Sequence, residues 1–124
     1  MLSPALASAQ NEINLAATGG HDQLWRGVVP GANAGAWFDQ GPLNPSDVRR
    51  DLVVGSPGTD SVAGRIHILF GGPIFTGEQS LSSANITIVG AVGERFGSSS
   101  ATGNIKTTEI SNTARELVVG APNA

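Results

Sequence analysis

The sequence predicts an all-β fold, and three observations lead to this prediction. Seventeen glycines and seven prolines are spread along the 124 residues, so short elements alternate with turns. Apolar residues alternate in the segment 65–70, where Ile66, Ile68 and Phe70 share one face, as in a half-buried strand. The segment DLVVGSP at 51–57 returns 65 positions later as ELVVGAP at 116–122. A repeat of this length, made of several short strands, is typical of the blades of a β-propeller.

The expected strands follow in order along the chain. The segment 24–27 occupies the place before the first copy that 86–90 occupies before the second. Between them and the repeats lie GANAGAWFDQG at 31–41 and GAVGERFGSSSATG at 90–103, in which we expect Phe38 and Phe96 to be equivalent core residues.

The repeated Leu-Val-Val segments are apolar on both faces. This pattern predicts strands that are covered on both faces, as in sheets packed face to face. In the next strand His67 alternates with Ile66 and Ile68, so we expect it on the less buried face.

Composition excludes several classes of function. The net charge is −3 with a single lysine, Lys106, so the basic face needed for nucleic-acid binding is missing. There is no cysteine, which excludes disulfides and cysteine–zinc sites. No apolar run approaches the roughly 20 residues of a membrane-spanning helix, so we expect no transmembrane segment.

The chain divides into an N-terminal segment, 1–20, and a repeat region, 21–124. Ala7-Ser8-Ala9 matches the small-x-small pattern of signal-peptidase sites, so residues 1–20 are either the tail of a signal peptide or a flexible Ala/Ser-rich start.

At its repeats the chain resembles the FG-GAP family, found in integrin α-subunits and bacterial surface proteins. The second copy has Phe96-Gly97 and Gly120-Ala121-Pro122; the first has Phe38-Asp39 and Gly55-Ser56-Pro57. The resemblance implies a partial β-propeller: about two blades of antiparallel strands, a fragment of a seven-bladed ring.

The resemblance also implies a function. Such a chain would be a non-catalytic binding, adhesion or scaffolding module with a protein or glycan ligand, located extracellularly, at the cell surface or in the periplasm. Its blades would pack against further blades of the same chain or self-associate. An isolated chain of this kind should be unstable, aggregate or assemble into a ring, because an inner strand at its end would leave an unpaired edge.

Some members of the family carry a calcium loop that leads into the Leu-Val-Val strand. In the first copy Asp47 and Asp51 match the third and last ligand positions, whereas the earlier positions hold Leu43 and Pro45. Calcium takes six to eight oxygen ligands. Two interpretations stay open: weak residual calcium binding through Asp47 and Asp51, or a loop that has lost the metal.

Two alternative functions are also compatible with the sequence. One is the propeller portion of an exported hydrolase whose catalytic residues lie outside this chain. The other is a carbohydrate-binding propeller with Trp25, Trp37 and Phe38 as an aromatic platform, although such residues more often pack in a core. His21 and His67 lie in separate segments, no Gly-x-Ser-x-Gly elbow occurs and the carboxylates are scattered, so the chain itself is not expected to be an enzyme.

Overall fold

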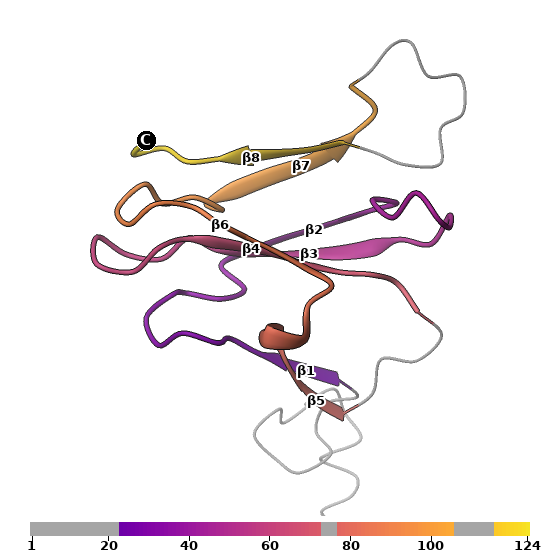
Figure 1. Ribbon diagram of the computed structural model, residues 1–124, viewed down its shortest axis with the longest axis horizontal. Helices are drawn as coiled ribbons and strands as arrows, with labels where there is room; N and C mark the ends of the chain where they lie inside the picture. The colour runs from indigo at the N-terminus through magenta and orange to yellow at the C-terminus, as the bar shows by residue number, and fades with distance from the viewer. Residues whose placement is uncertain (1–22, 73–76, 106–115) are drawn as a thin grey trace, which may run out of the picture.

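The computed structural model describes residues 23–72, 77–105 and 116–124 (Figure 1). These residues form strands and one short 3-10 helix, so the predicted all-β class is confirmed. Ala7-Ser8-Ala9, the segment 1–20 and His21 lie outside the described residues. In chain order the elements are β1 (Gln23–Arg26), β2 (Trp37–Gly41), β3 (Asp51–Ser56), β4 (Arg65–Leu69), β5 (Gly77–Ser80), η1 (Leu81–Ser83), β6 (Ile86–Val89), β7 (Ser99–Gly103) and β8 (Glu116–Gly120).

A four-stranded antiparallel sheet forms the middle of the molecule. Its strand order is β2-β3-β4-β6, so neighbouring strands follow one another along the chain with β5 left out. Val53 of β3 lies opposite Ile68 of β4, and Ile66 of β4 lies opposite Ile88 of β6. The β-branched residues of the predicted strands therefore pair across the two central ladders, where such side chains pack well.

Each face of this sheet carries a buried apolar cluster, as the Leu-Val-Val pattern predicts. Val53 is fully buried on one face in a cluster with Ile66 and Ile68. Its neighbour Val54 is buried on the other face in a cluster with Leu69 and Leu81. Because consecutive strand residues point to opposite faces, one apolar strand supplies side chains to both clusters.

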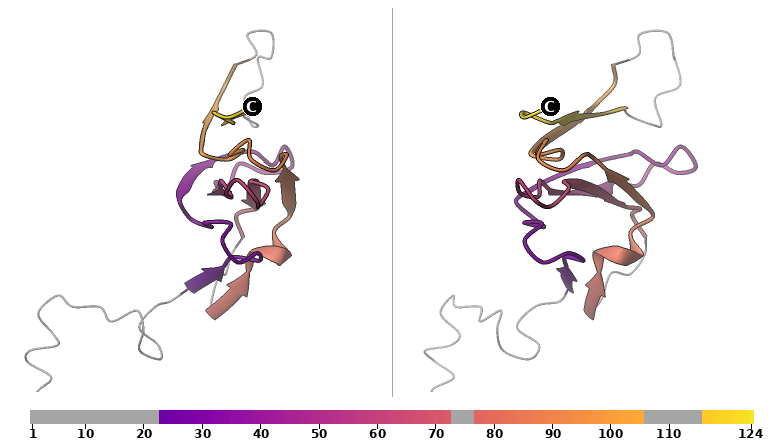
Figure 2. Two further views of the ribbon diagram at one scale, coloured as in Figure 1. Left: turned by 90° about the vertical axis from the view of Figure 1, so that its left-hand side faces the viewer. Right: turned by 60° about the vertical axis from the view of Figure 1, so that its left-hand side comes forward.

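Two smaller layers cover the faces (Figures 1 and 2). The antiparallel β7–β8 hairpin packs on the Val53 cluster through Phe96, Leu117 and Val119. On the opposite side lie η1 and the β1–β5 pair, in which Trp25 packs on the Val54 cluster. β1 and β5 run parallel, which differs from the expected purely antiparallel pairing.

The two hairpins repeat one backbone conformation. Trp37 of β2 pairs with Gly55 of β3, and Ser99 of β7 pairs with Gly120 of β8. The turn before each hairpin has positive φ at alternate positions, and its last glycine donates a 3.0 Å hydrogen bond to the glycine carbonyl of the second strand. The positive-φ residues are Gly31, Asn33 and Gly35 in the first turn and Gly93, Arg95 and Gly97 in the second.

The expected equivalence of Phe38 and Phe96 is wrong. The strands β2 and β7 are related by 62 positions, whereas β3 and β8 are related by 65, because the second hairpin loop is three residues longer. Phe96 is therefore the counterpart of Ala34 and lies in the turn before β7. Phe38 is the counterpart of Ser100, lies within β2 and is 71% exposed.

The expected exposure of His67 is also wrong. His67 is 3% exposed and lies on the same face as Leu69, between Val54 of β3 and Thr87 of β6. Its Nδ1 is 3.1 Å from the Thr87 hydroxyl. Alternation places His67 away from Ile66 correctly, but that second face is covered as well.

The first prediction concerns the core. Ile66→Ala should lower the free energy of unfolding by about 2–5 kcal/mol, because a fully buried side chain leaves a cavity between sheet and hairpin. Val92→Ala, at an exposed turn position, is the control and should change it by less than about 0.5 kcal/mol. Chemical denaturation measures both, and equal effects would contradict the packing.

The second prediction concerns pH. Burial lowers the pKa of His67 from its ordinary value of 6.5, and the positive charge of Arg65 lowers it further. The unfolded chain therefore binds a proton first as pH falls below about 6.5, so stability should be complete above that pH and decline below it. His67→Gln should flatten this decline, measured as melting temperature against pH. Parallel curves for the two proteins would contradict a buried neutral histidine.

Candidate binding site

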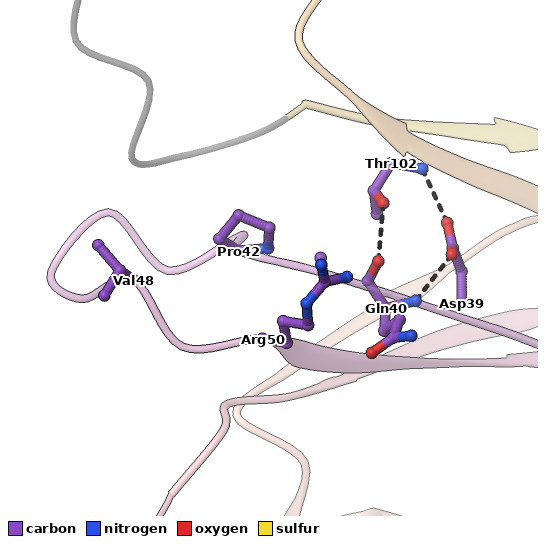
Figure 3. Close-up of a pocket in the computed structure, with 7 residues that line it drawn as sticks. Asp39, Gln40, Pro42, Val48, Arg50 and Thr102 are labelled. Carbon is purple, nitrogen blue, oxygen red and sulfur yellow. Dashed lines mark hydrogen bonds between the residues drawn. The ribbon is translucent and has the colours of Figure 1, made fainter.

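A polar pocket of about 490 Å³ lies between strand β2, the β2–β3 loop and strand β7 (Figure 3). It opens beside the edge where the four-stranded sheet meets the β7–β8 hairpin. The lining residues are Asp39, Gln40, Gly41, Pro42, Val48, Arg50 and Thr102.

Two hydrogen bonds and one close approach hold β2 and β7 side by side at this pocket. The backbone N–H of Thr102 donates to Asp39 Oδ2 at 2.8 Å, and the Thr102 hydroxyl donates to the Gln40 carbonyl at 3.0 Å. Asp39 Oδ1 also accepts the N–H of Gln40 at 2.8 Å. At Gly41 an added Cβ would lie 2.6 Å from the Thr102 hydroxyl oxygen, so the close approach needs glycine.

The remaining polar groups of the pocket are available to a ligand. Within the described residues, no hydrogen bond or ion pair engages the guanidinium of Arg50 or the side-chain amide of Gln40, and the two ion pairs use Arg26 and Arg95. Arg50 is exposed, and Figure 3 shows its side chain rising between Pro42 and Gln40. A planar guanidinium suits a carboxylate, which accepts charge-assisted hydrogen bonds.

The wall of the pocket formed by the β2–β3 loop is fixed by Asp51. This carboxylate is 1% exposed; its Oδ2 accepts the N–H groups of Leu43 and Asn44, each at 2.7 Å. Its Oδ1 accepts the N–H of Gly71 at 2.9 Å, which ties the segment after β4 to the same point. Asp51 therefore accepts three backbone N–H groups, of which that of Leu43 also donates to the Gly41 carbonyl at 3.0 Å.

Asp47 has a local role in the same loop. Its Oδ1 accepts the N–H of Arg49 at 2.9 Å, and its Oδ2 accepts from the amide of Asn44 at 3.2 Å. Asn44 in turn accepts the N–H of Ser46. These bonds close a turn, as Asp and Asn side chains commonly do.

Both carboxylates of the predicted calcium loop take part in hydrogen bonds. Each oxygen of Asp51 and Asp47 accepts at least one N–H group. Among residues 23–72, 77–105 and 116–124, no group of three or more His, Cys, Asp or Glu side chains could hold a metal ion. In the second copy the positions that correspond to the first three ligands are Thr108, Ile110 and Asn112, and they lie outside the described residues.

The glycines on which the FG-GAP resemblance rests pack closely against neighbouring strands and turns. A Cβ on Gly55 would lie 2.5 Å from the Gly97 carbonyl oxygen, and one on Gly97 would lie 2.6 Å from that of Arg65. Gly120 accepts the hydrogen bond of Gly97 at the end of β8. Pro57, Ala121 and Pro122 follow the second strand of each hairpin.

The three aromatic residues considered as a sugar platform do not share a face. Trp37 packs with the Val53 cluster, whereas Trp25 and Phe38 line an apolar groove on the other face. The pocket residues Gln40, Arg50 and Thr102 were missed from the sequence. The pair Arg49-Arg50 was the only signal, and nothing in the sequence placed it beside β7.

Comparison of the chain with protein-family models, curated proteins and solved structures found no match. In the described part of the chain, no helix has the length and apolar character needed to cross a membrane.

The third prediction concerns Asp51 and calcium. Asp51→Asn should lower the free energy of unfolding by about 1–3 kcal/mol, because one amide oxygen cannot replace a carboxylate that accepts three backbone bonds. Asp60→Asn, which removes the same charge at an exposed position, is the control and should cost at most about 1 kcal/mol.

Calcium at sub-millimolar concentration should leave the melting temperature of the wild-type chain unchanged, because Asp51 already stabilises the loop without metal. A low-micromolar dissociation constant that is lost in Asp47→Ala would contradict this assignment of roles.

Proposed function

We propose that this chain is a non-catalytic binding and scaffolding module built from β-propeller blades of the FG-GAP kind. In this proposal the four-stranded sheet β2-β3-β4-β6 is one blade, and the β7–β8 hairpin is the inner half of the next. The proposal carries with it an extracytoplasmic location, at the cell surface, in the periplasm or outside the cell.

The observation that carries the proposal is the repeated hairpin. Two hairpins with the same register, the same alternating positive φ and the same closing hydrogen bond pack face to face. A second hydrogen bond repeats with them: Gly58 donates to the Ala32 carbonyl, and Asn123 donates to the Glu94 carbonyl. Propeller blades are related to one another in this way, with short sheets stacked around a central channel.

The ligand surface in this proposal is the polar pocket between the first strands of the two blades. Arg50 supplies a cation and Thr102 is a neighbour fixed by its hydrogen bonds to β2, so the preferred ligand carries a carboxylate. Acidic sugars and acidic peptide side chains both present this group. The chain has a net charge of −3, so its overall electrostatic field does not attract an acidic ligand. The attraction comes from the local positive charge of Arg50.

A binding role is favoured over catalysis by the composition of this pocket. Among the described residues that line it, Asp39 is the one carboxylate, and both of its oxygens already accept backbone N–H groups. General acid–base chemistry needs a group that is free to exchange a proton with the substrate. His67, the histidine of the described residues, is buried within the sheet layers and does not line this pocket.

The fourth prediction tests the pocket with two sets of probes. Arrays of glucuronate- or sialate-containing oligosaccharides and of Asp/Glu-rich peptides should show binding to one set, which identifies the source of the carboxylate. Arg50→Ala should weaken that binding by about 10- to 150-fold, the loss of a charge-assisted hydrogen bond worth about 1.5–3 kcal/mol.

Arg49→Ala is the matched control, because Arg49 is the exposed neighbour of Arg50 and does not line the pocket. It should bind within about twofold of the wild-type chain, since only a screened surface charge is lost. Equal losses in both variants, or binding unchanged by Arg50→Ala, would refute the pocket as the ligand site.

A further inference from the structure

An apolar groove of about 310 Å³ lies on the face of the four-stranded sheet opposite the β7–β8 hairpin. Strands β2 and β3 form its floor with Phe38, Leu52 and Val54, and Trp25 and Leu81 stand at its side. The Phe38 side chain is 71% exposed there. We call the surface formed by Phe38, Gln40, Leu52 and Val54 the open β2–β3 face.

The repeat shows what kind of surface this is. Its four residues are the counterparts of Ser100, Thr102, Leu117 and Val119 in the β7–β8 hairpin. Leu117 and Val119 pack on the Val53 cluster of the neighbouring sheet, and Thr102 donates to Gln40 and Asp39 of β2. The open β2–β3 face therefore has the backbone and the apolar positions of a surface that packs on another sheet.

The opposite end of the molecule carries the complementary surface. Val118 on the outer side of β8 is the counterpart of Val53, which is fully buried under the hairpin, yet Val118 is 53% exposed. Its cross-strand partner Ala101 is exposed beside it. We call the surface formed by Ala101 and Val118 the outer β7–β8 face. Figure 1 shows the β7–β8 hairpin and the β1–β5 layer on opposite sides of the central sheet.

We propose that copies of this chain associate head to tail, with the open β2–β3 face of one copy packed on the outer β7–β8 face of another. The contact continues the interface that already exists between the central sheet and the β7–β8 hairpin. Because the two surfaces differ, the contact is heterologous. A pair of copies leaves one surface of each kind free, so further copies add until a ring closes or a filament forms. This inference deepens the proposed scaffold and rests on the same repeat, but not on the ligand pocket.

The two halves of the contact can be broken separately. Phe38→Asp places a charge on the open β2–β3 face, and Val118→Asp places one on the outer β7–β8 face. Both positions are exposed, so each variant should fold. Sedimentation velocity over a concentration series should show association of the full wild-type chain, and each variant alone should associate at least tenfold more weakly. If Phe38→Asp does not fold, Phe38→Ser replaces it, since serine is the residue at the equivalent position 100.

Mixing the two variants is the decisive measurement. Phe38→Asp retains an intact outer β7–β8 face, and Val118→Asp retains an intact open β2–β3 face. An equimolar mixture should therefore form a one-to-one dimer with near wild-type affinity that cannot grow further. Val92→Asp, at an exposed turn position outside both faces, is the control and should associate like the wild-type chain.

Several outcomes would overturn the proposal. A wild-type chain that stays monomeric at all concentrations would do so, and a fall in melting temperature for Phe38→Asp in that monomer would show that the chain's own remaining residues cover the groove. Association that Phe38→Asp leaves unchanged, or that the mixture does not restore, would also overturn it. Arg50→Ala should associate normally, so failure of the ligand pocket and failure of the head-to-tail contact are separable.

Discussion

The arrangement of the layers depends on one close contact between backbones. Gly97, with a φ of 86°, lies against Arg65 at the start of β4, and its carbonyl oxygen lies where a side chain at Gly55 would begin. Gly64 is enclosed in the same way by the Phe96 carbonyl. A Cβ at any of these glycines would meet backbone atoms that cannot rotate away, so the turn before β7 would have to move off the sheet. The contact explains why the glycines of the repeated motif are needed although none of them takes part in chemistry.

That contact places everything else at the edge of the hairpin. With the turn held against β3 and β4, Leu117 and Val119 reach the Val53 cluster, and Thr102 comes within hydrogen-bond distance of Asp39 and Gln40. The polar pocket is then a consequence of the packing: its walls come from β2, the β2–β3 loop and β7, three segments far apart in the chain. Asp51 completes it from inside, because three backbone donors on one buried carboxylate fix both the loop and the segment after β4.

The strands that supply the core side chains can be predicted from the sequence, whereas less of the structure around them can. β3, β4, β6 and β8 follow from apolar runs, and their double-sided burial follows from the Leu-Val-Val pattern. Strand β7 could not be recognised, because Ser99–Gly103 holds only small and polar residues and reads as a loop; its partner β8 and the preceding turn make it a strand. His67 was misplaced because alternation reports which face a residue takes and not whether that face is covered. The pocket was missed because Arg50 and Thr102 meet only through the fold.

The position of Phe38, which differs from the predicted one, shows how the two copies of the repeat differ. If Phe38 and Phe96 were equivalent, both would fill an interface within the molecule. Their true counterparts are Ser100 and Ala34, so the two hairpins place their large side chains differently on one backbone.

In the hairpin that packs internally, Phe96 fills the interface from the turn, and Ser100 at the strand position is small enough to let the sheets approach. In the first hairpin Ala34 leaves room at the turn, and the bulk stands on the strand as Phe38, exposed beside a groove that also includes Ala34. Burying an exposed phenylalanine beside such a groove removes apolar surface from water and lowers the free energy. This stabilisation is gained only if another surface covers the side chain. The second hairpin carries its large side chain in the turn, and the chain completes that interface by itself. The first hairpin carries its large side chain on the strand, so a partner must fit around Phe38.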